Sequence, residues 1–213
     1  MTQKAIYIAF LFFTTGLNVV GQNTMATNEH CSTKPPDFTR LPSYKEMNVA
    51  LDAVLRLHPV LTPAYASNLV YQIREDNVST EAKVYAIFLL GELRSTNIFA
   101  IEALVDRIDL KAPRSEPALR LRLWGEYPAV EALEKIGLSA VNPILNRLPN
   151  EGIAFRRHLM CKVLIFIEGK KGGNVNQAEG RKVVLKQVQD KLGNESDPAK
   201  RVNLELVLKE VQR

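Results

Sequence analysis

Metal-ligating side chains are scarce in this chain of 213 residues, which contains only two cysteines and three histidines. The histidines are His30, His58 and His158, and none is spaced as a metal ligand from another donor. The pair His158-x-x-Cys161 supplies two donors one helical turn apart, whereas zinc sites use three or four protein donors. The sequence therefore predicts no metal site, and we expect His158 on the surface of a helix.

The two cysteines leave two alternatives open. Cys31 lies in a polar segment, and Cys161 lies in the middle of an apolar helical stretch. In an oxidising compartment the two thiols could form a disulfide that ties the N-terminal segment to the rest of the chain. Alternatively, Cys161 is a small core residue and no bond forms.

The signatures of common catalytic sites are also missing. The sequence has no nucleophile elbow, phosphate-binding loop, dinucleotide fingerprint or zinc-protease motif. Residues 170–174 (KKGGN) have the lysines and glycines of an anion-binding turn, but no predicted strand precedes them, so an exposed loop is expected. The formal net charge of +5 is too mild to indicate nucleic-acid binding. We expect no catalytic residue, no cofactor and no nucleic-acid partner.

Aromatic side chains make up only 7% of the chain, and Trp124 is the single tryptophan. A core of Leu, Ile, Val and Ala favours packed helices over a β-sandwich. Apolar residues at 46% and charged residues at 24% are typical of a soluble globular chain. The composition therefore predicts an all-α domain with a substantial core.

The first 21 residues have the features of an export signal. Lys4 precedes an unbroken apolar run over 5–13, and Val19-Val20-Gly21 offers small or modest side chains for cleavage after Gly21, with Ala26 as a second choice. A buried helix or an uncleaved anchor is the alternative, but the run is too short to span a bilayer comfortably. We expect an exported protein, periplasmic or secreted, without stable membrane insertion after cleavage.

A polar lead-in and a helical domain follow the signal. Residues 22–43 contain three prolines and no periodicity, which predicts a flexible segment. From residue 44 onward, apolar residues recur at the 3–4 spacing of amphipathic helices. Helix pairs are predicted at 44–57 with 63–73, 80–93 with 98–110, 128–137 with 139–148 and 154–167 with 181–192, and a last helix at 197–213.

Individual residues delimit these helices. Thr62-Pro63 is a cap followed by a first-turn proline, and Pro128 suits the same position of its helix. Gly137 can end that helix in a left-handed conformation. Pro143 lies too deep for a first-turn proline, so the helix that contains it is expected to start late or to kink.

The pairs recur with a period near 40 residues, which is typical of helical repeats. Residues 128–148 (PAVEALEKIGLSAVNPILNRL) resemble a HEAT repeat, and so do 84–108 (VYAIFLLGELRSTNIFAIEALVDRI). Residues 197–211 (DPAKRVNLELVLKEV) resemble the opening of another repeat. The resemblance covers residues 44–213 and implies an α-α superhelix of about four helix pairs plus a terminal helix, interrupted at 111–127 and 169–180.

The first interruption carries the predicted contact residues for a partner. Its sequence ALRLRLW alternates apolar and basic residues, which indicates an extended segment. Arg120, Arg122, Trp124 and Tyr127 are side chains of the types that dominate binding hot spots. The alternative is that the intervening leucines pack on the domain and the arginines are solvated.

The predicted function is that of a non-enzymatic scaffold for another protein or peptide, bound on a concave face formed by the second helix of each pair. Helix phase assigns eight exposed residues to this face, namely Asn68, Gln72, Glu102, Arg107, Asn142, Arg147, Gln187 and Lys191. The alternative function is a HEAT-like lyase or ligand-binding protein with its site in the concave face or at 111–127. A cavity with convergent polar groups and perturbed titration would favour that alternative.

Overall fold

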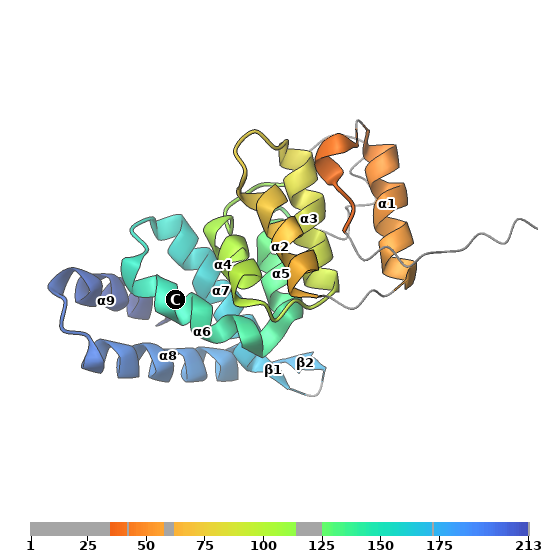
Figure 1. The fold of residues 1–213 in the computed structure, drawn as a ribbon. Coiled ribbons are helices and arrows are strands. Elements are labelled where there is room, and N and C mark those ends of the chain that lie inside the picture. Colours follow the sequence, from red (N-terminus) through yellow and green to blue (C-terminus); the bar gives the residue numbers. More distant parts are fainter. Residues whose placement is uncertain (1–34, 42, 58–61, 114–124, 172, 213) are drawn as a thin grey trace, which may run out of the picture. The chain divides into compact units, whose positions relative to one another are not determined.

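The computed structural model describes residues 35–41, 43–57, 62–113, 125–171 and 173–212 of the chain. The predicted signal at 1–21 and most of the predicted lead-in lie outside these residues. The described part is all-α apart from one two-residue β-ladder, so the prediction of an all-α chain is confirmed (Figure 1).

The helices begin and end as follows: α1 (Tyr44–Leu57), α2 (Pro63–Arg74), α3 (Thr80–Glu92), α4 (Ile98–Asp106), α5 (Pro128–Ile136), α6 (Val141–Arg147), α7 (Ala154–Gly169), α8 (Gln177–Asn194) and α9 (Pro198–Gln212). Short 3-10 helices lie at η1 (Phe38–Arg40), η3 (Gly137–Ala140) and η4 (Leu148–Asn150). The antiparallel ladder pairs β1 (Lys170–Lys171) with β2 (Asn174–Val175).

Local sequence signals explain most of these ends. The hydroxyl of Thr62 accepts a hydrogen bond from the backbone N–H of Tyr65, and Pro63 occupies the first turn of α2. Gly137 ends α5 with a φ of +76°, a conformation that costs glycine little. The helix that contains Pro143 starts late, at Val141, after a turn of 3-10 helix.

Two rows of helices surround the core. Each odd-numbered helix from α1 to α9 contacts the next odd-numbered helix, while α2 contacts α4 and α4 contacts α6 (Figure 1). The rows also contact each other through α2 with α3, α4 with α5, α6 with α7 and α8 with α9. Both helices of the predicted pair at 80–110 form, as α3 and α4, but they do not pack on each other as a pair: α4 packs on α2, α5 and α6.

Two predictions about irregular segments are wrong. The predicted flexible lead-in to residue 43 contains an ordered part, because residues 35–41 are described and the Phe38 side chain is 0% exposed in the core. The predicted interruption at 169–180 is largely regular structure, because β1 and β2 form a tight hairpin and α8 begins at Gln177. The Asn176 side chain caps α8 by accepting the backbone N–H of Glu179.

Candidate functional site

Of the four predicted contact residues of the insertion, Arg120, Arg122 and Trp124 lie outside the described residues. Tyr127 is half-buried directly before α5. Its ring lies 5.3 Å from that of Phe155, centroid to centroid, and the Lys111 ammonium lies 5.6 Å from its centroid. Tyr127 is therefore a packed residue at the base of the insertion.

The two ends of the 111–127 segment are joined. The backbone N–H of Ala112 donates to the carbonyl of Glu126 at 3.0 Å, and the Lys111 ammonium lies 2.8 Å from the Glu126 carboxylate. These bonds place the start and the end of the insertion side by side at the N-terminus of α5.

The eight residues assigned to the second helices divide into three groups. Asn68, Glu102, Asn142 and Arg147 are exposed, whereas Arg107, Gln187 and Lys191 are half-buried. The Arg107 guanidinium donates to the carbonyl of Arg74, and the Lys191 ammonium donates to the amide oxygen of Asn146 at 2.9 Å.

The prediction for Gln72 is wrong, because this side chain is buried with 1% exposure. Its Oε1 accepts the backbone N–H of Phe38 at 3.0 Å, and its Nε2 donates to the carbonyl of Pro36 at 3.0 Å. Helix phase points Gln72 outward from the helical core, but residues 35–41 cover it. Gln72 therefore holds the N-terminal segment in place.

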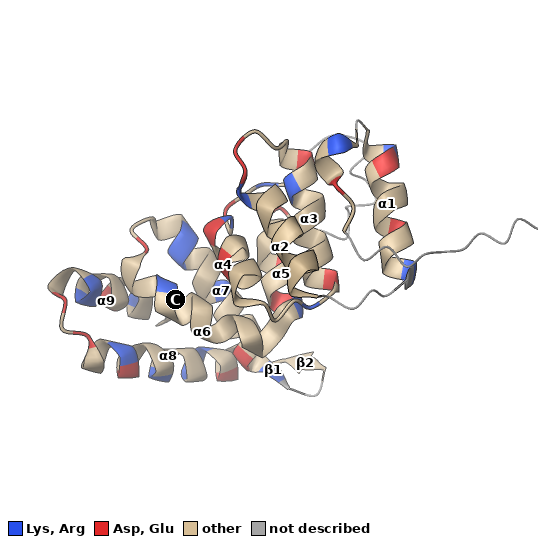
Figure 2. Cartoon of the chain, viewed as in Figure 1, with Lys and Arg blue, Asp and Glu red and all other residues tan. Residues whose placement is uncertain are grey.

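Two polar clefts flank α6. The α4–α6 cleft, of about 330 Å³, is lined by Glu102, Val105, Asp106, Pro143, Asn146, Arg147 and Asn150. The α6–α8 cleft, of about 490 Å³, includes Asn142, Leu145, Gln187, Asp190, Lys191 and Leu204 among its lining residues. Figure 2 shows both signs of charge along α8, so this face presents mixed charges.

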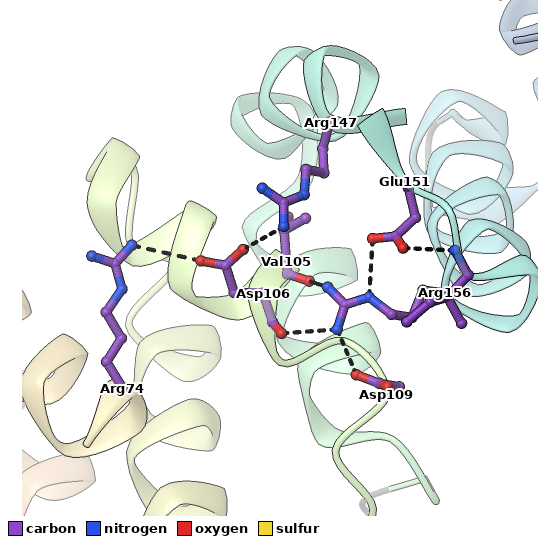
Figure 3. A network of polar contacts seen from close by, with 8 residues as sticks. Arg74, Val105, Asp106, Asp109, Arg147, Glu151 and Arg156 are labelled. Atoms are coloured by element: carbon purple, nitrogen blue, oxygen red, sulfur yellow. Dashed lines mark hydrogen bonds and ion pairs between the residues drawn. The ribbon is translucent and has the colours of Figure 1, made fainter. Parts of the chain in front are cut away.

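The α4–α6 cleft stands on a network of paired charges (Figure 3). The Asp106 carboxylate lies between two guanidinium groups, 3.9 Å from that of Arg74 and 3.2 Å from that of Arg147. The Arg156 guanidinium lies 2.8 Å from the Asp109 carboxylate and 3.0 Å from that of Glu151. It also donates to the backbone carbonyls of residues 105 and 106. This network connects α4 to α6 and α7, and its members Asp106 and Arg147 line the cleft.

A third cleft lies on the other side of α7 and was not predicted. We call it the Glu134 cleft; it has a volume of about 430 Å³ and is lined by Glu134, His158, Cys161, Lys162, Ile165, Phe166, Gln177, Arg181 and Glu210. These residues come from α5, α7, α8 and α9. His158 is exposed on α7, as predicted, and its Nδ1 lies 2.6 Å from the Glu210 carboxylate.

Burial perturbs two groups of this cleft. It raises the pKa of Glu134 to about 7, although Lys162 and Lys170 oppose the shift. Burial also raises the pKa of the Cys161 thiol to about 12, and this side chain is only 2% exposed. A thiol that stays protonated and covered is a poor nucleophile, so Cys161 behaves as a core residue.

The cysteine alternatives stay open because Cys31 lies outside the described residues. Among residues 35–41, 43–57, 62–113, 125–171 and 173–212, no three His, Cys, Asp or Glu side chains are grouped to hold a metal ion. In the same part of the chain, no helix has the length and apolar character needed to cross a membrane.

Comparisons with known proteins give no assignment for the chain. No protein-family model matches it, and neither the curated proteins nor the solved structures contain a match.

Proposed function

We propose that this chain is an exported helical-repeat scaffold that binds another protein or peptide. In this proposal the helix pairs stack as an α-α superhelix of HEAT-like repeats. The row of contacts from α1 through α9 supports stacking, since stacked pairs place each helix against the corresponding helix of the next pair.

The observation that carries the binding proposal is the position of α6 between two polar clefts. We call the surface formed by α4, α6 and α8 the α6 face. Asn142 and Asn146 extend from α6 into neighbouring clefts, so a bound chain that crosses α6 would meet amide, carboxylate and cationic groups on both sides.

An arginine placed on α6 tests this proposal. Asn142→Arg adds a long cationic side chain to the face, and Asn77→Arg makes the same change on an exposed residue outside both clefts. After cross-linking in the native extracytoplasmic fraction, we expect wild type and Asn77→Arg to recover the same partner and Asn142→Arg to recover at least about tenfold less. Equal recovery by all three proteins, or no partner with wild type, contradicts the proposal.

The insertion supplies a second arm of the same experiment. Arg120→Ala combined with Trp124→Ala tests whether its basic and aromatic residues contribute to the partner contact. Unchanged recovery by this double variant removes the insertion from the binding surface.

The export proposal has its own measurement. N-terminal sequencing of protein from the extracytoplasmic fraction is expected to give a start after Gly21. Protein that starts at Met1 and remains in the cytosol overturns it.

A further inference from the structure

The Glu134 cleft combines a size and a lining that suit a small ligand. Its volume of about 430 Å³ falls within the range of small-molecule sites. Ile165 and Phe166 form an apolar wall, while Glu134, Lys162 and Arg181 bring charges of both signs. The cleft is therefore amphipathic.

Some of the charged groups of the cleft already have partners. His158 contacts Glu210 at 2.6 Å, which joins α7 to α9. The Arg181 guanidinium donates to the carbonyl of Val211 at 2.8 Å, which joins α8 to α9. These groups hold the cleft together and are not available as the main contacts of a ligand.

Glu134 and Lys162 differ from these groups. Within the part of the chain that the structure describes, neither side chain forms a hydrogen bond or an ion pair, although their charges are near enough to interact. A half-buried carboxyl group without a partner is costly to the fold. Charged groups kept in this state inside a cavity are typical of binding sites.

We propose that the Glu134 cleft binds a small zwitterion with an apolar side chain, of the α-amino-acid class. The ammonium group of the ligand contacts the Glu134 carboxylate, and its carboxylate contacts the Lys162 ammonium. Its side chain packs on Ile165 and Phe166. This ligand matches the half-buried carboxylate of Glu134, the exposed ammonium of Lys162 and the apolar wall, whereas a molecule with one charge leaves one of these two groups without a counter-charge.

The charged groups around Glu134 set the pH dependence of this binding. Lys162 and Lys170 favour its ionised form and Glu131 disfavours it, while His158, Arg181 and Glu210 line the same cleft. The ligand's ammonium group binds the ionised carboxylate. Affinity is therefore expected to fall as the pH decreases below about 7, where Glu134 takes up a proton.

Calorimetric titration of the whole chain tests the ligand class. We expect L-phenylalanine or L-leucine to bind, and 2-phenylethylamine and 3-phenylpropionate, which each keep one charge, to bind at least about tenfold more weakly. No binding of either amino acid at millimolar concentration overturns the proposal. Equal binding of the amine or the acid overturns recognition of a zwitterion.

Matched variants locate the site. Glu134→Gln and Lys162→Met are expected to weaken binding of the amino acid by about tenfold or more. Glu205→Gln and Lys182→Met remove the same charges at exposed residues outside the cleft and are expected to leave the affinity unchanged. Retained affinity in both cleft variants, with thermal unfolding like that of wild type, contradicts the assignment. The Asn142→Arg variant keeps this cleft intact, so failure of the scaffold proposal and failure of the ligand proposal are distinguishable.

Discussion

Glu151 and Glu134 lie on either side of α7, and their carboxyl groups have opposite surroundings. The Glu151 side chain is only 6% exposed. Its carboxylate accepts hydrogen bonds from the Arg156 guanidinium and from the backbone N–H of Ile153. Glu134 is more exposed than Glu151, yet it has no hydrogen-bond or ion-pair partner among the described residues, and burial raises its pKa to about 7. The more deeply buried acid is thus the better compensated one.

This difference separates structural charge from functional charge. A buried charge contributes to a stable fold only when paired and hydrogen-bonded, as around Arg156. An unpaired carboxyl group gives the fold no benefit, and this is the basis of the ligand proposed for the Glu134 cleft. Variants at these residues test this distinction through the stability of the fold.

The largest effect is expected from Arg156→Met. The change leaves Glu151 buried without its cation and removes the bonds to Asp109 and to the carbonyls of residues 105 and 106. We expect the free energy of unfolding in urea to fall by about 3–5 kcal/mol. Arg40→Met, at a pair whose arginine is 86% exposed, serves as the control and should cost at most about 1 kcal/mol. Equal losses in the two variants would mean that the Arg156 network has no special structural role.

A smaller effect is expected from Gly180→Ala, which concerns the wall of the Glu134 cleft. A Cβ at Gly180 would lie 2.1 Å from the carbonyl oxygen of Ile165, so α8 must move away from α7. The expected loss is about 1–3 kcal/mol of unfolding free energy. Gly193→Ala makes the same change in α8, but a Cβ at Gly193 would have no atom within 4 Å. This variant should stabilise the protein by up to about 1 kcal/mol. Thermal unfolding shifts of the same sign in both variants would contradict close packing at Gly180.

A pH-dependent effect is expected from Glu134→Gln. Burial raises the pKa of Glu134 from 4.5 to about 7, so between these values the folded state binds more protons than the unfolded state. Wild-type stability should therefore decrease as the pH rises from 4.5 to 7, and the glutamine variant should lack this decrease. Because Glu134 is partly exposed, we expect the free energy of unfolding of the variant at pH 8 to exceed that of wild type by up to about 2 kcal/mol. A variant that is less stable than wild type at pH 8 would indicate a hidden partner for Glu134.

The sequence predicts those parts of the fold that depend on local signals. Apolar periodicity locates the helices, Thr62-Pro63 marks the start of α2, and Gly137 marks the end of α5. Each of these signals acts within a turn or two of the chain, so it is visible without knowledge of the tertiary structure. The early start of α8 was missed because Gly180 weakens the helical pattern. Its lack of a side chain instead permits the close approach to α7.

The candidate sites depend on contacts between distant residues, and the sequence contains little trace of them. Phe38 has only Leu41 as an apolar neighbour in a proline-rich segment, so its burial and the covering of Gln72 have no extended periodic signal. The Glu134 cleft draws on α5, α7, α8 and α9, and only His158-x-x-Cys161 hints at it. A polar residue on an amphipathic helix is predicted to face water, and nothing local distinguishes Glu134 from the solvated glutamates.

The smallest effect is expected from His158→Gln. Like Arg156→Met, this change removes a basic group beside a glutamate. The His158 side chain is 54% exposed and contacts Glu210 at 2.6 Å, and glutamine retains a donor for this carboxylate. Glu210 also has further interactions, so it is not left without a partner. We expect a loss of at most about 1 kcal/mol in urea unfolding, and less at high salt. Arg156→Met is expected to cost much more. The difference would show that burial of the carboxylate, rather than the presence of an opposing basic group, decides how much such a pair contributes to the stability of the fold. A loss near that of Arg156→Met would place the His158–Glu210 contact among the structural pairs, and the Glu134 cleft would then have a charged framework as essential as the one beneath the α6 face.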